Sequence, residues 1–299
     1  MSSYFAKLLR SSWAIVLVAG ATACSGAGMT GSNSPAVPAP ARRAPAPQPS
    51  PHASYVTIVL MENKDEDRII GSPKAPYING TLVPSGALLA NSHAVGHPSE
   101  PNYLALFSGS THHVHGDPCP LTYHSTNVAS ELIAAGLSFG GYSESMPYDG
   151  FTGCETQKYA RKHSPWVNFT NVPARDNLVY HRFPKSPQSL VWITPNLCND
   201  MHNCEISRGD KWLSNHLPPI IAWNEQHNGL LIVTFDEASP DRNHTNHIAT
   251  IFVGPMVVPG SVNQQDVDHY SVLQTIESIF GLPCILNDCN ATSITGIWQ

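Results

Sequence analysis

Two short apolar segments, each ending in a pair of oxygen-bearing side chains, most constrain the fold of this 299-residue chain. Residues 55–61 are β-branched and aliphatic and lead into the polar pair 62–63; residues 230–235 lead in the same way into the pair 236–237. Runs of this length and composition are typical of buried strands in a parallel sheet. Because open α/β folds place their active sites at the carboxyl edge of the sheet, we expect both polar pairs to lie at that edge.

The two pairs are Glu62 with Asn63 and Asp236 with Glu237, which together carry three carboxylates. Three carboxylates converging from two strands repel one another unless a cation or a proton lies between them. The pattern therefore predicts a site for one divalent metal ion, although oxygen ligands suit several hard cations and do not identify it. The alternative is that these acids are ordinary loop residues or helix caps.

Ser99 is the candidate nucleophile. It precedes a predicted helix near residues 101–108, at or near the N-cap, with Pro101 in the first turn. A hydroxyl there is close to free backbone N–H groups and the positive end of the helix dipole, which favour an oxyanion. Beside a divalent cation it would become a usable nucleophile. A serine before a helix is also commonly a simple cap.

Alternating strand-like and helix-like segments predict an α/β fold with a mainly parallel sheet. The predicted strands lie near residues 55–61, 138–143, 190–194, 230–235 and 248–253. The predicted helices lie near residues 74–85, 101–108, 127–136, 206–226 and 269–280.

Eight ordered blocks of this sequence resemble those of the phosphoesterase family, which includes secreted acid phosphatases and bacterial phospholipases C. The blocks are residues 59–63, 97–103, 142–148, 159–165, 193–196, 199–202, 234–237 and 269–271. The resemblance runs from about residue 54 to residue 298. It implies the three-layer α/β sandwich of the alkaline-phosphatase-like superfamily. Several blocks are especially similar to those of secreted mycobacterial acid phosphatases that act on phosphatidylinositol 3-phosphate.

The resemblance also implies roles for individual residues. Glu62, Asn63, Asp236 and Glu237 match the metal ligands of the family, and Ser99 matches the nucleophile that also touches the metal.

Two histidines, His163 and His202, match residues that face the phosphate. A histidine in that place can donate to phosphoryl oxygens and protonate the leaving alkoxide. Arg161 and Lys162 resemble phosphate or head-group contacts, although such a pair on a loop is often simply solvated.

Three further residues, Asn102, Asn196 and Asp200, lie in matching blocks and are predicted to bind substrate or orient the site. His269 opens the last block, where it either supports the site or is a satisfied core histidine.

The chain departs from the family at two places. Fungal members carry an aspartate where this chain has Asn203, which weakens the case for a second metal or a tuned His202. The loop at residues 238–247 also differs from the acidic loop of the mycobacterial relatives, which leaves substrate choice the least secure inference.

The amino terminus predicts export. Lys7 and Arg10 precede an apolar run that is too short to span a membrane, so residues 1–23 are expected to be a signal peptide. Cys24 follows small residues and is a candidate lipid-acylation site, favoured over ordinary secretory cleavage after Ala23. Residues 24–52 are rich in Ala, Pro, Ser and Gly and predict a semi-extended spacer before a phosphoesterase domain at residues 53–299. The expected location is the cell surface, as a lipoprotein, or the medium.

Seven cysteines are present, and six remain when Cys24 is set aside. An even number in an exported chain favours disulfides, and proximity alone suggests Cys119–Cys154, Cys198–Cys204 and Cys284–Cys289. The Cys198–Cys204 pair would enclose Asp200 and His202.

The formal charge of −6 and the lack of a basic helix argue against a nucleic-acid partner. We therefore expect an exported acid phosphatase that hydrolyses phosphomonoesters, with a phosphoinositide as a candidate substrate, through a metal-assisted phosphoserine. Two alternatives stay open: a phospholipase C-type phosphodiesterase, and a non-catalytic surface lipoprotein that binds phosphorylated ligands.

Overall fold

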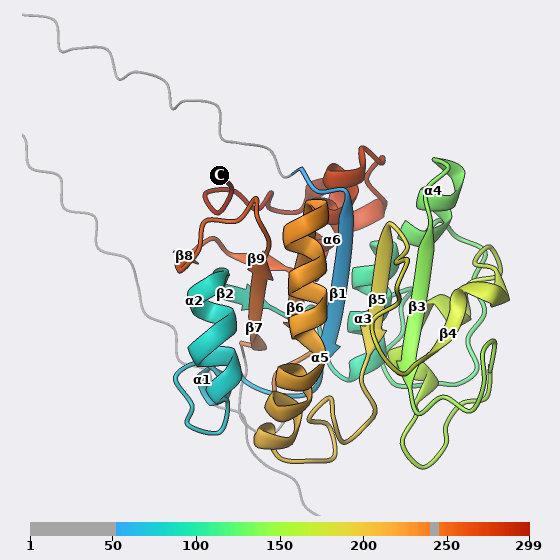
Figure 1. The fold of residues 1–299 in the computed structure, drawn as a ribbon. Helices are drawn as coiled ribbons and strands as arrows, with labels where there is room; N and C mark the ends of the chain where they lie inside the picture. Colours follow the sequence, from blue (N-terminus) through green and yellow to red (C-terminus); the bar gives the residue numbers. More distant parts are fainter. Residues whose placement is uncertain (1–51, 240–244) are drawn as a thin grey trace, which may run out of the picture. The chain divides into compact units, whose positions relative to one another are not determined.

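A nine-stranded sheet lies between two layers of helices in the computed structural model, which describes residues 52–239 and 245–299 (Figure 1). The described residues belong to one compact unit. The predicted signal peptide at residues 1–23, the acylation site Cys24 and the predicted spacer up to residue 51 lie outside the described residues. None of the described helices is both long and apolar enough to cross a bilayer.

The strand order of the sheet is β4-β3-β5-β1-β6-β7-β2-β8, and β9 also pairs with β2. The strands are β1 (Tyr55–Met61), β2 (Ala87–His93), β3 (Phe139–Glu144), β4 (Asn177–Tyr180), β5 (Leu190–Thr194), β6 (Gly229–Phe235), β7 (His247–Val253), β8 (Ser261–Asn263) and β9 (Val267–Asp268). All strand pairs are parallel except those that β7 makes with β6 and β2. The sheet is therefore mainly parallel, as predicted.

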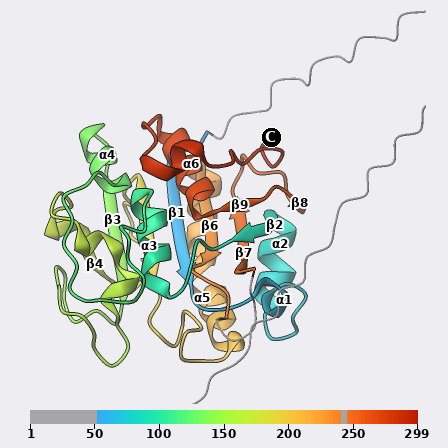
Figure 2. The ribbon, with the colours of Figure 1, turned by 180° about the vertical axis from the view of Figure 1, so that it is seen from behind.

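Helices cover both faces of the sheet, and the two opposite views separate them (Figures 1 and 2). The α-helices are α1 (Glu66–Ile69), α2 (Val83–Ser85), α3 (Ser99–Ser108), α4 (Val128–Ala134), α5 (Ile206–His227) and α6 (His269–Phe280). Short helical turns are η1 (Ile78–Leu82), η2 (Arg161–His163), η3 (Pro165–Asn168), η4 (Ala174–Asp176) and η5 (Leu286–Asn290).

Strand β1 shows why the fold has three layers. Ile58 and Leu60 pack into an apolar cluster with α3, α4 and α6, whereas the alternating Val59 and Met61 pack into a second cluster with α1, η1 and α5. Successive side chains of a strand point to opposite faces, so an entirely apolar strand needs a helical layer on each side.

The five predicted strands are present, but four strands, β2, β4, β8 and β9, were not predicted. β2 begins with the apolar run Ala-Leu-Leu-Ala but ends in the polar residues Asn-Ser-His, and β9 has only two residues. The predicted helix at residues 74–85 is helical from residue 76, with a π-helical turn at Ile78–Leu82. Asp210 of α5 accepts hydrogen bonds from the backbone N–H groups of Tyr77 and Ile78 and holds this turn.

All three predicted disulfides are present: Cys119–Cys154, Cys198–Cys204 and Cys284–Cys289. Each predicted pair had joined cysteines that are close in the sequence. The second one closes the loop that contains Asp200 and His202, as expected.

Candidate active site

The site begins where β1 and β6 end side by side. Met61 pairs with Phe235 in register, and the N–H of Asp236 donates to the carbonyl of Met61 over 2.9 Å. The N–H of Asn63 then donates to Oδ1 of Asp236 over 3.0 Å. Asn63 has a φ of 51°, a left-handed conformation that asparagine tolerates and that turns the chain away from the strand. The two polar pairs therefore meet at the carboxyl edge, as the strand pattern predicted.

Ser99 is the first residue of α3, with Pro98 at the N-cap, and it is almost fully buried. Its Oγ donates a hydrogen bond to Oε2 of Glu62 over 3.1 Å. The hydroxyl lies in the first turn of a ten-residue helix, where free backbone N–H groups and the helix dipole favour negative charge. The sequence thus located both the hydroxyl and the carboxylate that it contacts.

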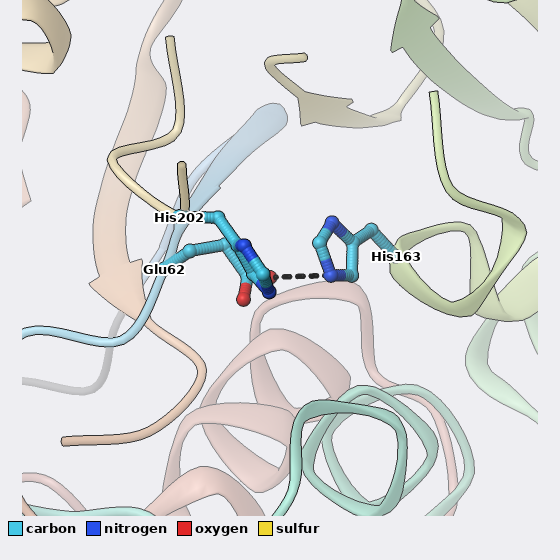
Figure 3. Close-up of side chains that lie close together, drawn as sticks. All are labelled: Glu62, His163 and His202. Atoms are coloured by element: carbon cyan, nitrogen blue, oxygen red, sulfur yellow. Dashed lines mark ion pairs between the residues drawn. The ribbon is translucent and has the colours of Figure 1, made fainter. Parts of the chain in front are cut away.

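His163 lies on the other side of Glu62, at the end of η2 (Figure 3). Its Nε2 is 3.2 Å from Oε1 of Glu62, and its Nδ1 is 3.6 Å from Oδ2 of Asp200. Tyr103, one turn along α3 from Ser99, donates its hydroxyl hydrogen bond to Oε1 of Glu62 and stacks on the His163 ring with an interplanar angle of 8°. The pKa of His163 lies well below its ordinary value. Burial is the main cause, and the charges of Lys162 and His202 lower the pKa further. This shift favours the neutral form of the His163 imidazole.

The loop that carries His202 is held against the end of β1. The N–H of Glu62 donates to the carbonyl of Asp200 over 2.8 Å, and Nζ of Lys64 donates to the carbonyl of Met201 over the same distance. Oδ1 of Asp200 accepts from the N–H of His202 over 2.7 Å. These contacts hold His202, which is partly exposed, beside the His163 ring at a centroid distance of 5.7 Å.

Four buried carboxyl side chains, which we call the acidic site group, converge here: Glu62, Asp200, Asp236 and Glu237. Burial is the main cause that raises the pKa of all four, and repulsion by the neighbouring acids raises it further for Glu62, Asp200 and Glu237. The pKa of Glu237 rises to about 9, even though Lys162 and the Ser99 hydroxyl oppose the rise. Four desolvated acids in one place favour a bound proton or a cation.

Several oxygens of this group have the character of cation ligands. Oδ1 of Asn63 and Oδ2 of Asp236 are buried and have no hydrogen-bond partner in the described part of the chain. Together with carboxylates of Glu62 and Glu237 they form the hard donor set that divalent cations prefer. Within the described ranges, Glu62, His163 and His202 also bring one ligand atom each within 4.8 Å of one another. The residues present therefore fit a divalent cation, and Glu62 belongs to both donor sets.

Three side chains lie at the rim of the site: His97, Asp117 and Lys162. The sequence predicted no role for the first two. Nδ1 of His97 contacts Oε2 of Glu237. Asp117 accepts a hydrogen bond of 2.7 Å from Nζ of Lys162 and another from the N–H of Glu100 in α3. Burial alone would lower the pKa of Lys162, but Asp117 and the charges of Glu62 and Asp236 raise it overall. A raised pKa favours the cationic form of Lys162 at this rim, and its contact with phosphate stays a prediction.

Two residues predicted to bind substrate have their polar groups occupied by the protein interior. The amide of Asn102 accepts from the N–H groups of Val95 and Gly96 and donates to the carbonyls of Gly96 and Pro98. The guanidinium of Arg161 donates to Oδ1 of Asn168 and to the backbone carbonyls of Thr152, Leu121 and Val167. Asn102 therefore holds the loop before Ser99, in agreement with the predicted orienting role, and Arg161 joins three loops, whereas their contacts with substrate stay predictions.

Asn196 also has a supporting position. Its Oδ1 accepts from the N–H groups of Cys198 and Asn199, and its Nδ2 donates to Oγ of Ser145. These bonds shape the start of the disulfide-closed loop and use one of the two N–H donors of the amide, and the substrate contact of Asn196 stays a prediction. Asp200 differs, because it lies within the acidic site group and contacts the backbone of His202.

His269 supports the site and is also buried, which reconciles the two alternatives left by the sequence. Its Nε2 lies 2.6 Å from the carbonyl oxygen of Asp236, at the first residue of α6. Burial lowers the pKa of this imidazole, so the neutral ring donates to the carbonyl and positions the backbone of Asp236.

Sequence reasoning missed Tyr103, His97 and Lys64 as members of the site. The ring of Tyr103 packs in the apolar core, and only its hydroxyl reaches the site. Its spacing of four residues from Ser99 was the available signal, because such residues share one helix face. No comparable signal links His97 to Glu237, which is 140 residues away.

Comparisons with known proteins agree with this geometry. A family model described as the Phosphoesterase family matches residues 73–283. The phosphatidylinositol-3-phosphatase of Mycobacterium tuberculosis is 44% identical over 83% of this chain and 84% of its own length. A phosphate-repressible acid phosphatase of Penicillium chrysogenum is 30% identical over 70% of this chain and 56% of its own length. This chain thus spans little more than half of that fungal relative.

The protein belongs to the Phosphoesterase family. Among solved structures, a protein of the alkaline phosphatase superfamily from Vibrio parahaemolyticus matches with a TM-score of 0.55 and 11% identity, over 82% of this chain and 71% of its own. At that identity the match concerns the fold, and it confirms the predicted alkaline-phosphatase-like architecture.

Proposed function

We propose that this protein is an exported acid phosphatase that hydrolyses phosphomonoesters through a phosphoserine at Ser99. One observation carries the proposal: a buried serine hydroxyl in the first turn of α3 donates to Glu62 within a group of buried carboxylates. A hydrogen bond from the same hydroxyl lowers the pKa of Asp236 and of Glu237, against the effect of burial. Ser99 therefore lies beside the three acids at the strand ends, Glu62, Asp236 and Glu237. A non-catalytic binding protein has no need for a hydroxyl in this environment.

In the first half-reaction Oγ of Ser99 attacks phosphorus in line with the ester oxygen, so that the Oγ–P bond forms as the P–O bond to the alcohol breaks. Oε2 of Glu62 already accepts the Oγ hydrogen and is the nearest acceptor for the proton that leaves. Backbone N–H groups at the start of α3 and the cation of Lys162 at the rim would stabilise the equatorial phosphoryl oxygens.

Protonation of the departing alcohol is assigned to His202. It is partly exposed at the mouth of the site, whereas His163 is almost completely buried between Tyr103, Glu62 and Asp200. His163 would instead keep Glu62 in place. In the second half-reaction water attacks the phosphoserine from the side that the alcohol has left, the Oγ–P bond breaks, and Ser99 recovers its proton.

A divalent cation held by Glu62, Asn63, Asp236 and Glu237, with Ser99 beside it, would neutralise the acidic site group and stabilise charge on the phosphoryl oxygens. Glu62, His163 and His202 are the second donor set that the geometry offers. The chemistry of these donors suits several metals, so we propose one ion without naming the element.

A phosphoinositide is the proposed substrate class, supported by 44% identity to a phosphatidylinositol-3-phosphatase. Three disulfides support an oxidising location outside the cytoplasm. We retain the proposed domain limits: a signal peptide at residues 1–23, a spacer at residues 24–52 with acylation at Cys24, and the catalytic domain at residues 53–299.

The test is phosphate release from p-nitrophenyl phosphate and from bis(p-nitrophenyl) phosphate, with and without chelator. We expect the monoester to be the better substrate and Ser99→Ala to lose at least about a thousandfold in kcat, since the covalent route is removed. Ser278→Ala, which changes an exposed serine on α6, is the matched control and should keep the wild-type rate. Wild-type rates in Ser99→Ala would disprove the phosphoserine, and a faster diester would indicate a phosphodiesterase.

A further inference from the structure

A cavity of about 620 Å³ lies beside the site, between the end of β1, the loop closed by Cys198–Cys204 and the start of α5. Lys64, Arg68 and Arg208 bring three cationic groups to its lining, and we call it the cationic cavity. Its volume is in the range of small-molecule sites and would hold a phosphorylated polyol.

The charge of the cationic cavity contrasts with that of the chain, whose formal net charge is −6. Glu205 is the one acid in the lining, and it is paired with Lys74 over 3.1 Å. The neutral Asn203 lies at the same wall. Three positive groups around one acid that is already paired make this cavity a place of positive potential, which attracts anions.

The cationic groups keep donors available for a ligand. Arg68 is exposed, and its guanidinium makes no hydrogen bond or ion pair with any residue of the described ranges, although its backbone N–H donates to the carbonyl of Asp65. Arg208 uses Nε to hold Oδ1 of Asn199 over 2.9 Å, which leaves its terminal nitrogens for other partners. Lys64 donates to the carbonyls of Asn63 and Met201, and an ammonium has three donors. A planar guanidinium fork matches the oxygens of a phosphate group.

The cationic cavity adjoins the reacting centre through His202. This side chain lines the cavity and also lies within 4.8 Å, atom to atom, of ligand atoms on Glu62 and His163. Lys64 lies two residues beyond Glu62 and donates to the backbone next to His202. His202 therefore connects the lining of the cationic cavity to Glu62, the carboxylate that Ser99 contacts.

We propose that the cationic cavity is a subsite for a second phosphoryl group of the same substrate molecule. The inference rests on the proposed function, and it specifies the substrate class as polyol phosphates with two phosphoryl groups on one ring. The second group can be a monoester, as in a polyol bisphosphate, or the diester that joins a phosphoinositide head group to its lipid. Arg68 is then a specificity-determining residue that does not touch the reacting atoms.

The kinetic test compares three soluble substrates: inositol 3-phosphate, inositol 1,3-bisphosphate and glycerophosphoinositol 3-phosphate. We expect Arg68→Gln to lower the ratio of kcat/KM for either two-phosphate substrate over inositol 3-phosphate by about tenfold, equivalent to about 1.4 kcal/mol. Arg68→Lys should recover part of the ratio, and added salt should reduce it in the wild type. Arg182→Gln, which changes an exposed arginine outside the lining, should leave the ratio unchanged. A ratio that falls for inositol 1,3-bisphosphate identifies the monoester as the second group, and one that falls for glycerophosphoinositol 3-phosphate identifies the diester.

A binding measurement separates this proposal from the proposed function. Inositol 1,3-bisphosphate is titrated calorimetrically into Ser99→Ala and into Ser99→Ala with Arg68→Gln, so that no turnover is needed. A tenfold weaker affinity in the second protein supports the subsite even if the wild type hydrolyses none of the esters. Equal affinities, or an equal loss of affinity for inorganic phosphate, would overturn it.

Discussion

Two groups of buried carboxyl side chains lie in different parts of the molecule and have different chemistry around them. The acidic site group lies at the carboxyl ends of β1 and β6, beside Ser99 and two histidines. Glu277 of α6 and Asp288 of η5 form a second buried pair, next to the Cys284–Cys289 disulfide. Burial, followed by the neighbouring Asp288, raises the pKa of Glu277 to about 10.

The second pair has a structural task. Oδ1 of Asp288 accepts a hydrogen bond from the N–H of Ile285 and so holds η5. Neither a histidine nor a lysine is among the groups that shift the pKa of Glu277. One proton between two carboxyls is sufficient there. Buried acids alone therefore do not define a site; the nucleophile, the imidazoles and the unpartnered oxygens distinguish the first group from the second.

The largest expected effect is that of Asp236→Asn. This change removes a ligand oxygen and a charge from the acidic site group, and we expect kcat/KM for p-nitrophenyl phosphate to fall by about a hundredfold to a thousandfold. Asp288→Asn is the matched change in the other group, and it should keep the wild-type rate within about twofold. Similar losses in both variants would erase the distinction between the two groups.

Divalent cations should stabilise the folded protein by binding at the acidic site group and not at the pair of Glu277 and Asp288. We expect the Tm of the wild type to rise by about 5 °C when Mn²⁺ or Mg²⁺ is added at about a hundred times its Kd, because ligand binding stabilises the folded state by about 2.7 kcal/mol. Differential scanning fluorimetry with and without chelator measures the shift. Glu277→Gln should retain the rise and Asp236→Asn should lose it. A rise that survives in Asp236→Asn would locate the cation elsewhere.

Tyr103→Phe tests the hydrogen bond that the Tyr103 hydroxyl donates to Glu62. Loss of the hydroxyl leaves Glu62 with one hydrogen bond fewer but keeps the ring stacked on His163. We expect about a tenfold lower kcat and a fold of unchanged stability within about 1 kcal/mol. Tyr142→Phe, which removes the hydroxyl that donates to Gln188 over 3.0 Å, is the control in steady-state assays. Equal rates in both variants would assign Tyr103 to packing alone.

Because the pKa of Glu277 is raised in the folded state, the free energy of unfolding should fall as the pH rises. The folded state keeps its proton up to about pH 10, whereas the unfolded carboxyl releases it near pH 4.5. Its contribution to stability is therefore complete below pH 4.5 and is lost as the pH rises toward 10, by at most about 1.4 kcal/mol per pH unit. Glu277→Gln should gain on the wild type in urea denaturation between pH 5 and 9, whereas exposed Glu225→Gln should not. Parallel curves for wild type and Glu277→Gln would contradict the shared proton.

The sequence by itself determined the central strands, the carboxyl-edge pairs and the serine at the start of α3. These depend on local patterns: an apolar run of strand length, its polar end, and a proline-rich entry to a helix. Short sequence separation was also sufficient for the three disulfides.

Only the tertiary structure decided where individual side chains point. Arg161 and Lys162 are adjacent in the sequence, yet Arg161 donates to interior carbonyls and Lys162 pairs with Asp117 at the rim. Asn102 shares a helix with Ser99 but bonds to the loop that precedes it. Hydrogen-bond partners of this kind lie far apart in the sequence, and the folded backbone determines which side chain reaches them. The cationic cavity has the same origin, because Lys64 and Arg68 come from the segment after β1 and Arg208 comes from α5, and these segments meet only in the folded chain.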